Sequence, residues 1–370
     1  SASHVAFGST RVMATCATVG QAAGTAAALC AAGDVTPRGL SVAELQRALL
    51  RQDASIVGLA STDPEDLALR ATATASSTLS GLAVEESDEL WPLAADAGLV
   101  LPADPDLSGV ELLVDADRDT EIVIDLYDPE LGQNYVPRRL VSSTTLPVAA
   151  GARQWLKTGL DWSPETPRNA FLVVRANDAL ALHRSDRPTP GVLCFTRVPL
   201  RPSDESPQPL REWTDTGLLR RTFCLRTGET AAYSPAKATD GYARPYAGPH
   251  MWVSAPLADA PSPWLSLAWP EPVTLGRIEV IADDDVNEDL INLHHHRTPF
   301  DTLPTLLRDY RVEALDTDGT WRVIARAAEN RRRRETHTPA EQVTTSAIRV
   351  VVEATNGAAS AHIVAVRAYE

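Results

Sequence analysis

The stretch Val110-Glu-Leu-Leu-Val-Asp-Ala-Asp-Arg-Asp-Thr-Glu-Ile-Val-Ile-Asp-Leu-Tyr127 contains two short apolar runs joined by a polar turn. Runs of this length, rich in Val, Ile, Leu and Tyr and bounded by Asp, Asn, Gly or Pro, are typical of antiparallel strands. Ala170–Arg175 (Ala-Phe-Leu-Val-Val-Arg) repeats the pattern. We therefore expect an antiparallel β-sandwich over residues 61–205.

The strand pattern returns after Pro199–Gln208, a segment with three prolines that we interpret as a linker. At least six further strands are expected, in the stretches 264–269, 276–281, 309–315, 320–324, 347–353 and 362–369. Residues 206–370 thus form the linker and a second sandwich. The predicted fold class is mainly β, with two antiparallel, jelly-roll-like β-sandwich domains preceded by a two-helix segment over residues 1–60.

The N-terminal segment has helical rather than alternating periodicity. Residues 9–32 are nearly free of proline and charge, and Gly20 and Gly24 lie among many alanines. A helix so rich in small residues lets another backbone approach closely, so we expect it to be buried against another element. Further on, Ser41-Val-Ala-Glu44 matches a capping box and predicts a second helix through about Leu50.

Composition excludes several classes of protein. With 370 residues, 44% of them hydrophobic, the chain can bury large cores, so it is not disordered as a whole. Lys and Arg number 34 against 49 Asp and Glu, and the net charge of −15 argues against nucleic-acid or anionic-membrane partners. The stretch Val12–Ala32 is too weakly hydrophobic, and lacks the basic flank, for a signal peptide or a membrane span.

The four cysteines fit neither a disulfide scaffold nor a zinc motif. Cys16 and Cys30 are 14 residues apart in one predicted helix, or roughly 21 Å, and are expected to be free thiols. Cys194 and Cys224 could pair only if the fold brought them together. The sequence also lacks a nucleophile elbow, a His-Glu-x-x-His zinc motif and a Walker loop, so hydrolase chemistry has no support.

The first 58 residues carry a long motif: Ser3-His-Val-Ala-Phe-Gly-Ser-Thr-Arg-Val-Met13, then Thr15-Cys-Ala17 and Gly20-Gln-Ala-Ala-Gly-Thr-Ala-Ala-Ala28. This motif resembles the end of the flavin domain in a family of FAD-dependent oxidoreductases. The resemblance implies that the helix points its positive N-terminus at the flavin ring. It places four residues near the cofactor, namely Arg11, Met13, Thr15 and Cys16. It places Gln21 one or two turns further along the helix.

The chain departs from that family because it lacks the strand and Gly-x-Gly-x-x-Gly of a dinucleotide-binding unit. We therefore expect the C-terminal part of a larger oxidoreductase, with FAD in the intact parent and none bound to this chain alone. The missing flavin domain is the expected partner, and the two sandwiches are expected to cap or orient it. No catalytic residue is assigned.

The last 138 residues resemble the galactose-binding-like, discoidin-type jelly roll. The motifs that carry the resemblance are Asp240-Gly-Tyr242, Trp252-Val-Ser254, Trp264-Leu-Ser-Leu267, Gly319-Thr-Trp321 and Ile363-Val-Ala-Val366, in that order. This fold hosts sugar binders, phospholipid binders and purely structural modules, so it does not choose among them. The alternative function is a carbohydrate-binding module, and a purely structural or oligomerising role is the third reading.

The loop from Asp283 to Arg297 is the candidate ligand site of this jelly roll. Its carboxylates suit Ca²⁺ and its histidines suit transition metals, but the spacing is not that of a calcium loop, and no metal is assigned. In one interpretation the loop is a hydrogen-bonding rim for a sugar, and Trp252 or His295 provides a surface on which the sugar stacks. The proposed ligand-binding residues are Trp252, Asp284, Asp285, His295 and Arg297. The same residues are also consistent with a solvated sheet edge, or with a face toward the flavin domain.

Arg331–Arg334 is the one basic run. In so acidic a chain we interpret it as a solvated strand end or a contact with an acidic face.

Overall fold

The computed structural model describes residues 3–198, 213–284 and 300–370. The predicted linker, Pro199–Gln208, lies outside the described residues. The chain divides into a helical unit, residues 1–64, and a β unit, residues 65–370. Within the described residues no helix is both long and apolar enough to span a bilayer.

The helical unit contains α1 (His4–Thr10), α2 (Met13–Gly33) and α3 (Val42–Arg51). The first predicted helix is thus two helices, because the backbone of Val12 is extended and interrupts the helix between α1 and α2. The predicted capping box is confirmed at Ser41, whose hydroxyl accepts the amide of Glu44 at 3.4 Å. α3 buries Leu49 and Leu50, so an amphipathic face stabilises it.

The C-terminal sandwich pairs two antiparallel sheets. In the described part of the chain, one sheet has the order β1 (Thr72–Ala75), β16 (Trp264–Leu275), β21 (Val343–Thr355), β18 (Leu307–Leu315), β19 (Trp321–Ala327). The other has the order β15 (Trp252–Pro256), β22 (Ser360–Tyr369), β17 (Arg277–Ala282), β20 (Arg334–His337). All six predicted strands of this region are present, which confirms the second sandwich.

The middle sandwich is also built from two antiparallel sheets. Among the described residues, the first has the order β12 (Trp213–Thr214), β11 (Leu193–Arg197), β4 (Ala97–Ala103), β9 (Arg168–Val174), β6 (Thr120–Asp128), β7 (Arg139–Val148). The second has the order β13 (Thr222–Phe223), β10 (Leu180–Ser185), β5 (Glu111–Ala116), β14 (Leu225–Glu229), β2 (Gly81–Val84), with β3 (Glu89–Pro92) on β10 and β8 (Gly151–Lys157) on β5. The predicted mainly β fold class, with two sandwiches after a helical segment, is confirmed.

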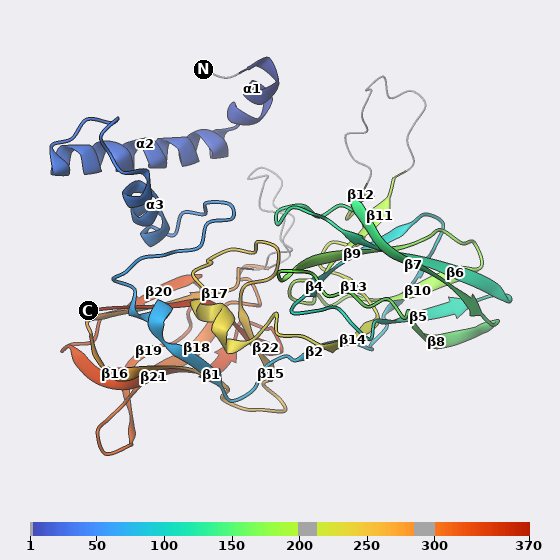
Figure 1. Ribbon diagram of the computed structural model, residues 1–370. Helices are drawn as coiled ribbons and strands as arrows, with labels where there is room; N and C mark the ends of the chain where they lie inside the picture. The colour runs from blue at the N-terminus through green and yellow to red at the C-terminus, as the bar shows by residue number, and fades with distance from the viewer. Residues whose placement is uncertain (1–2, 199–212, 285–299) are drawn as a thin grey trace. The chain divides into compact units, whose positions relative to one another are not determined.

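The predicted boundaries at residues 61 and 206 do not follow these sheets. β1 pairs with β16, so the C-terminal sandwich begins before the middle one, and Figure 1 shows this blue strand among the orange strands. β14 lies after residue 206 but pairs with β5 and β2 of the middle sandwich. The middle sandwich is therefore inserted between the first two strands of the C-terminal one, because strand patterns do not encode which distant strand is the partner.

The two sandwiches share apolar contacts. The core of the middle sandwich includes five residues of the C-terminal one. They are Met251, which directly precedes β15, Val253 on β15, Ile281 on β17, and Val364 and Ala365 on β22. The short 3-10 helix η1 (Leu67–Arg70) belongs to the C-terminal sandwich, since the Trp269 indole donates to Leu67 O at 2.8 Å. A second one, η2 (Pro235–Thr239), precedes β15. Residues 65–370 thus form one compact unit.

Candidate functional site

Four of the five residues assigned to the flavin lie around the start of α2. Arg11 ends α1, and its guanidinium lies 5.8 Å from the centre of the Phe7 ring. Met13 is the first residue of α2 and is 74% exposed. Cys16 is exposed, and its thiol donates to Thr10 O at 3.4 Å.

The other two follow along the same helix. Thr15 lies in the first turn and is half-buried. Gln21 lies two turns on and donates from Nε2 to Gln52 Oε1 at 3.1 Å. The structure therefore brings four of the five to one helix end, with Gln21 further along.

The N-terminus of α2 has the electrostatics that suit an electron-rich group. Val12 provides no side-chain cap, and the first turn contains no acidic residue. The first amides of the helix and the positive end of its dipole are therefore open to a bound anion or a reduced ring. These residues fit the group that the flavin resemblance implies.

α2 contains no buried residue in the described chain. Val19 is exposed on it, and an added Cβ at Gly20 or Gly24 would meet no atom within 4 Å. The close packing that we expected for this small-residue helix is absent from the described residues.

The assignment of Trp252 as a stacking surface is wrong. Trp252 is 0% exposed, lies in the core of the C-terminal sandwich, and donates its indole N–H to Ser77 O at 3.0 Å. A ring with no accessible face cannot stack on a ligand. Its position at the start of β15 directs it between the sheets, which a single Trp-Val-Ser motif does not reveal.

Asp284 is the other described member of the predicted ligand set. Its carboxylate accepts from Arg244 Nη1 at 2.5 and 2.7 Å and lies 3.5 Å from Arg333 Nε. The neighbouring Asp283 is buried, 2.9 Å from His362 Nδ1. Both carboxylates thus have structural partners. Arg333 belongs to the basic run, for which we gave two interpretations, a solvated strand end or a contact with an acidic face.

Asp285, His295 and Arg297 lie outside the described residues. In the part of the chain that is described, no group of three His, Cys, Asp or Glu side chains is placed to hold a metal ion.

One cavity in the described chain was not predicted. It has a volume of about 440 Å³ and lies where the β6–β7 connection of the middle sandwich meets the segment before β15. Its lining includes Asp128, Glu130, Asn169, Tyr242, Tyr246 and His250. A clue was present in the sequence, because two tyrosines and a histidine fall within nine residues of a Gly- and Pro-rich segment, 242–250.

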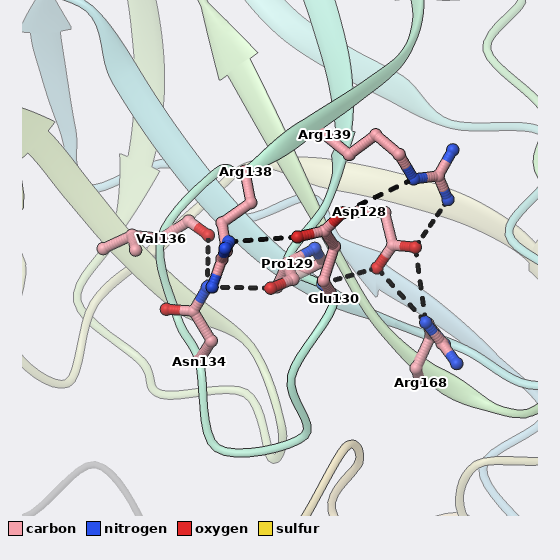
Figure 2. A network of polar contacts seen from close by, with 8 residues as sticks. All are labelled: Asp128, Pro129, Glu130, Asn134, Val136, Arg138, Arg139 and Arg168. Carbon is pink, nitrogen blue, oxygen red and sulfur yellow. Dashed lines mark hydrogen bonds and ion pairs between the residues drawn. The ribbon is translucent and has the colours of Figure 1, made fainter.

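One wall of the cavity is an ion-pair network (Figure 2). Buried Asp128 accepts from Arg139 at 2.7 Å and lies 3.3 Å from Arg168, while Glu130 lies 3.0 Å from Arg138. Burial alone would raise the pKa of Asp128, but the Glu130 amide and the two guanidinium groups outweigh it and hold that pKa below its usual range. Asp128 is therefore a fixed negative charge.

The opposite wall is aromatic. The rings of Tyr242 and Tyr246 are nearly parallel with centroids 6.1 Å apart, and Tyr242 lies 4.0 Å from the His250 ring. His250 Nδ1 is 2.6 Å from Asp240, and Nε2 is 2.6 Å from Tyr246 O. Because burial and the nearby Asp240 carboxylate raise the pKa of Tyr242, its phenol stays neutral at physiological pH. Both ring nitrogens of His250 are engaged, so the two phenols are the polar groups that this wall offers.

Comparisons with solved structures found distant likenesses. A chitosan-binding module from a chitosanase/glucanase of Paenibacillus sp. IK-5 is 12% identical, covers 38% of this chain and 87% of its own, and has a TM-score of 0.29. The family 32 carbohydrate-binding module of Streptococcus pneumoniae EndoD is 19% identical, with coverages of 37% and 86% and a TM-score of 0.29. The family 32 carbohydrate-binding module of C. perfringens NanJ, in complex with galactose, is 14% identical. The match covers 37% of this chain and 85% of that module, with a TM-score of 0.27. At these scores the likeness says nothing of what this chain binds.

The comparison with curated proteins returned no match. Residues 1–49 match the family model described as FAD dependent oxidoreductase. The predicted resemblance of the N-terminal helices to that family is therefore confirmed, over 49 of 370 residues.

Proposed function

We propose that this chain is the C-terminal accessory region of an FAD-dependent oxidoreductase. The observation that carries the proposal is the match of residues 1–49 to that family, on helices whose longest member buries none of its residues. In this proposal α2 completes a flavin domain. The two sandwiches are accessory and take no part in hydride transfer.

In that parent, Arg11 and the open amides at the start of α2 would hold electron density on the flavin ring, with Met13, Thr15 and Cys16 close to it. FAD would supply the redox chemistry. The chain's own contribution is electrostatic, because a helix dipole and an exposed guanidinium favour negative charge nearby.

The test compares the full-length gene product with the 370-residue chain. We expect flavin absorbance only in the former, and a full-length product that stays colourless after reconstitution with excess FAD would overturn the proposal. Two substitutions, Gly20→Ala and Gly24→Ala, test whether α2 packs closely against a neighbour in the full-length product. In the 370-residue chain each should raise helix stability by about 0.5–1 kcal/mol, since no atom lies within 4 Å of the added Cβ.

In the full-length product the same substitutions should lower flavin retention, because the added methyl groups would meet the helix's neighbour. Gly248→Ala is the control, since its added Cβ also meets nothing within 4 Å and it lies outside the residues that match the oxidoreductase family. Unchanged flavin retention in both α2 variants would contradict close packing of α2 in a flavin domain.

Carbohydrate binding by the C-terminal sandwich is the second candidate function. The observation that favours it is the aromatic wall of Tyr242 and Tyr246, which this sandwich presents to a cavity of about 440 Å³, within the usual range of about 300–1,000 Å³ for small-molecule sites. A glycan array probed with the whole chain tests it. Binding of no glycan would remove this candidate and leave the flavin proposal untouched.

A further inference from the structure

The cavity between the sandwiches is closed on one side by a direct contact between two loops. Ala247 N donates to Gly132 O at 2.7 Å, and the Tyr246 ring lies over Gly132. A Cβ at Gly132 would come within 2.6 Å of that ring, so only glycine permits this approach. The cavity therefore exists only because both sandwiches contribute to it.

The charges that line this cavity are already neutralised within the protein. Each ionised side chain has an opposite charge in contact, and the pairs are Asp128 with Arg139 and Arg168, Glu130 with Arg138, and Lys237 with Asp104. A charged ligand would have to displace one of these partners and leave a buried ion unpaired, which is costly. A neutral ligand meets no such cost.

Neutral hydrogen-bonding groups remain available at the cavity. Asn169 on β9 lines it, is 7% exposed, and its side-chain amide forms no hydrogen bond with any residue that the structure describes. The hydroxyl groups of Tyr242 and Tyr246 also form no hydrogen bond with any residue among 3–198, 213–284 and 300–370. The Asn169 amide and the two phenols are therefore available to a ligand that supplies both donors and acceptors.

We propose that this cavity binds a neutral saccharide, whose hydroxyl groups bond to the Asn169 amide and to the Tyr242 and Tyr246 phenols. The saccharide hydroxyl is both donor and acceptor, as the amide and phenols require, and the carbon face of a sugar suits the ring edges and the nearby Leu131. The inference rests on the second candidate function for its ligand class. It assigns the site to the junction of the two sandwiches and not to the loop at residues 283–297.

The experiment uses the whole 370-residue chain, an array of neutral and uronic-acid oligosaccharides, and calorimetric titration of the best neutral glycan. Asn169→Ala and Tyr246→Phe should each weaken binding by about tenfold, and Gly132→Ala should do so by displacing Tyr246. Tyr135→Phe is the matched control: it removes a phenol from the same β6–β7 connection, away from the cavity lining, and should leave affinity unchanged. Salt should have little effect on the affinity for a neutral ligand.

Thermal unfolding of each variant checks that it folds. Because Tyr246→Phe removes only a hydroxyl, it still tests the site if Asn169→Ala is unstable. Glycan binding that neither Tyr246→Phe nor Gly132→Ala weakens would overturn this site while leaving carbohydrate binding standing elsewhere on the chain. Preferred binding of acidic glycans, or of peptides offered as a second library, would overturn the neutral-saccharide assignment. Binding of no glycan would overturn both this inference and the second candidate.

Discussion

Replacing Trp252 by phenylalanine separates its role in the core from the ligand-stacking role that the sequence suggested. The indole is fully buried and donates to Ser77 O at 3.0 Å, which ties the segment after β1 to the start of β15. Phenylalanine keeps an aromatic ring but removes the donor and leaves a small void. We expect the free energy of unfolding to fall by about 2–4 kcal/mol, from an unpaired buried carbonyl and lost packing.

Urea unfolding followed by circular dichroism measures this change. With a slope of about 3 kcal/mol per molar urea, the midpoint should fall by about 1 M. The matched control is Trp321→Phe in the same sandwich, because Trp321 is half-buried under the Arg349 guanidinium and its indole donates to no residue that the structure describes. Equal midpoints for the two variants would refute the assignment of Trp252 as a hydrogen-bonded core residue.

Two further predictions concern buried ionisable groups. Burial would raise the pKa of Glu313, but hydrogen bonds from Arg311 and Arg349 outweigh it and lower that pKa, so its stabilisation is complete above about pH 4–5, the range of an unfolded glutamate. That contribution is lost as pH falls through the pKa of Glu313 in the folded protein. Between pH 7 and pH 3, the urea midpoint of Glu313→Gln should therefore fall less steeply than that of the wild type. Parallel plots of midpoint against pH for the two proteins would contradict this. Burial raises the pKa of the Cys194 thiol to about 12 and that of Cys224 to about 11, so mass mapping should find both unmodified by iodoacetamide in the native protein and labelled after unfolding; rapid native labelling would refute their burial.

Local signals were sufficient for most secondary structure. Ser41 and Glu44 cap α3 because a capping box acts within four residues, and the runs around residues 111–128 and 343–355 form strands because their apolar content suits a buried sheet. Cys16 and Cys30 are free in α2, as their spacing predicted. Cys194 and Cys224 are also free, a state that the sequence left open.

The candidate sites were less predictable than the strands. The helix end that carries Arg11 and Met13 could be proposed as a flavin contact because one continuous motif holds it. Trp252 was misassigned because an aromatic residue at a strand start reads the same whether it points into the core or out of it. The cavity was missed because Asn169 and Tyr246 are 77 positions apart in the printed sequence and no local pattern relates them.

By itself, the sequence determined the helical N-terminal segment, its likeness to FAD-dependent oxidoreductases, and the mainly β character of the remainder. Only the tertiary structure decided that β1 pairs with β16, that the middle sandwich is inserted into the C-terminal one, and that their junction forms a cavity. The physical reason is the range of the interactions. Helix caps and strand patterns act over a few residues, whereas strand pairing and cavity formation depend on contacts between segments that only folding brings together.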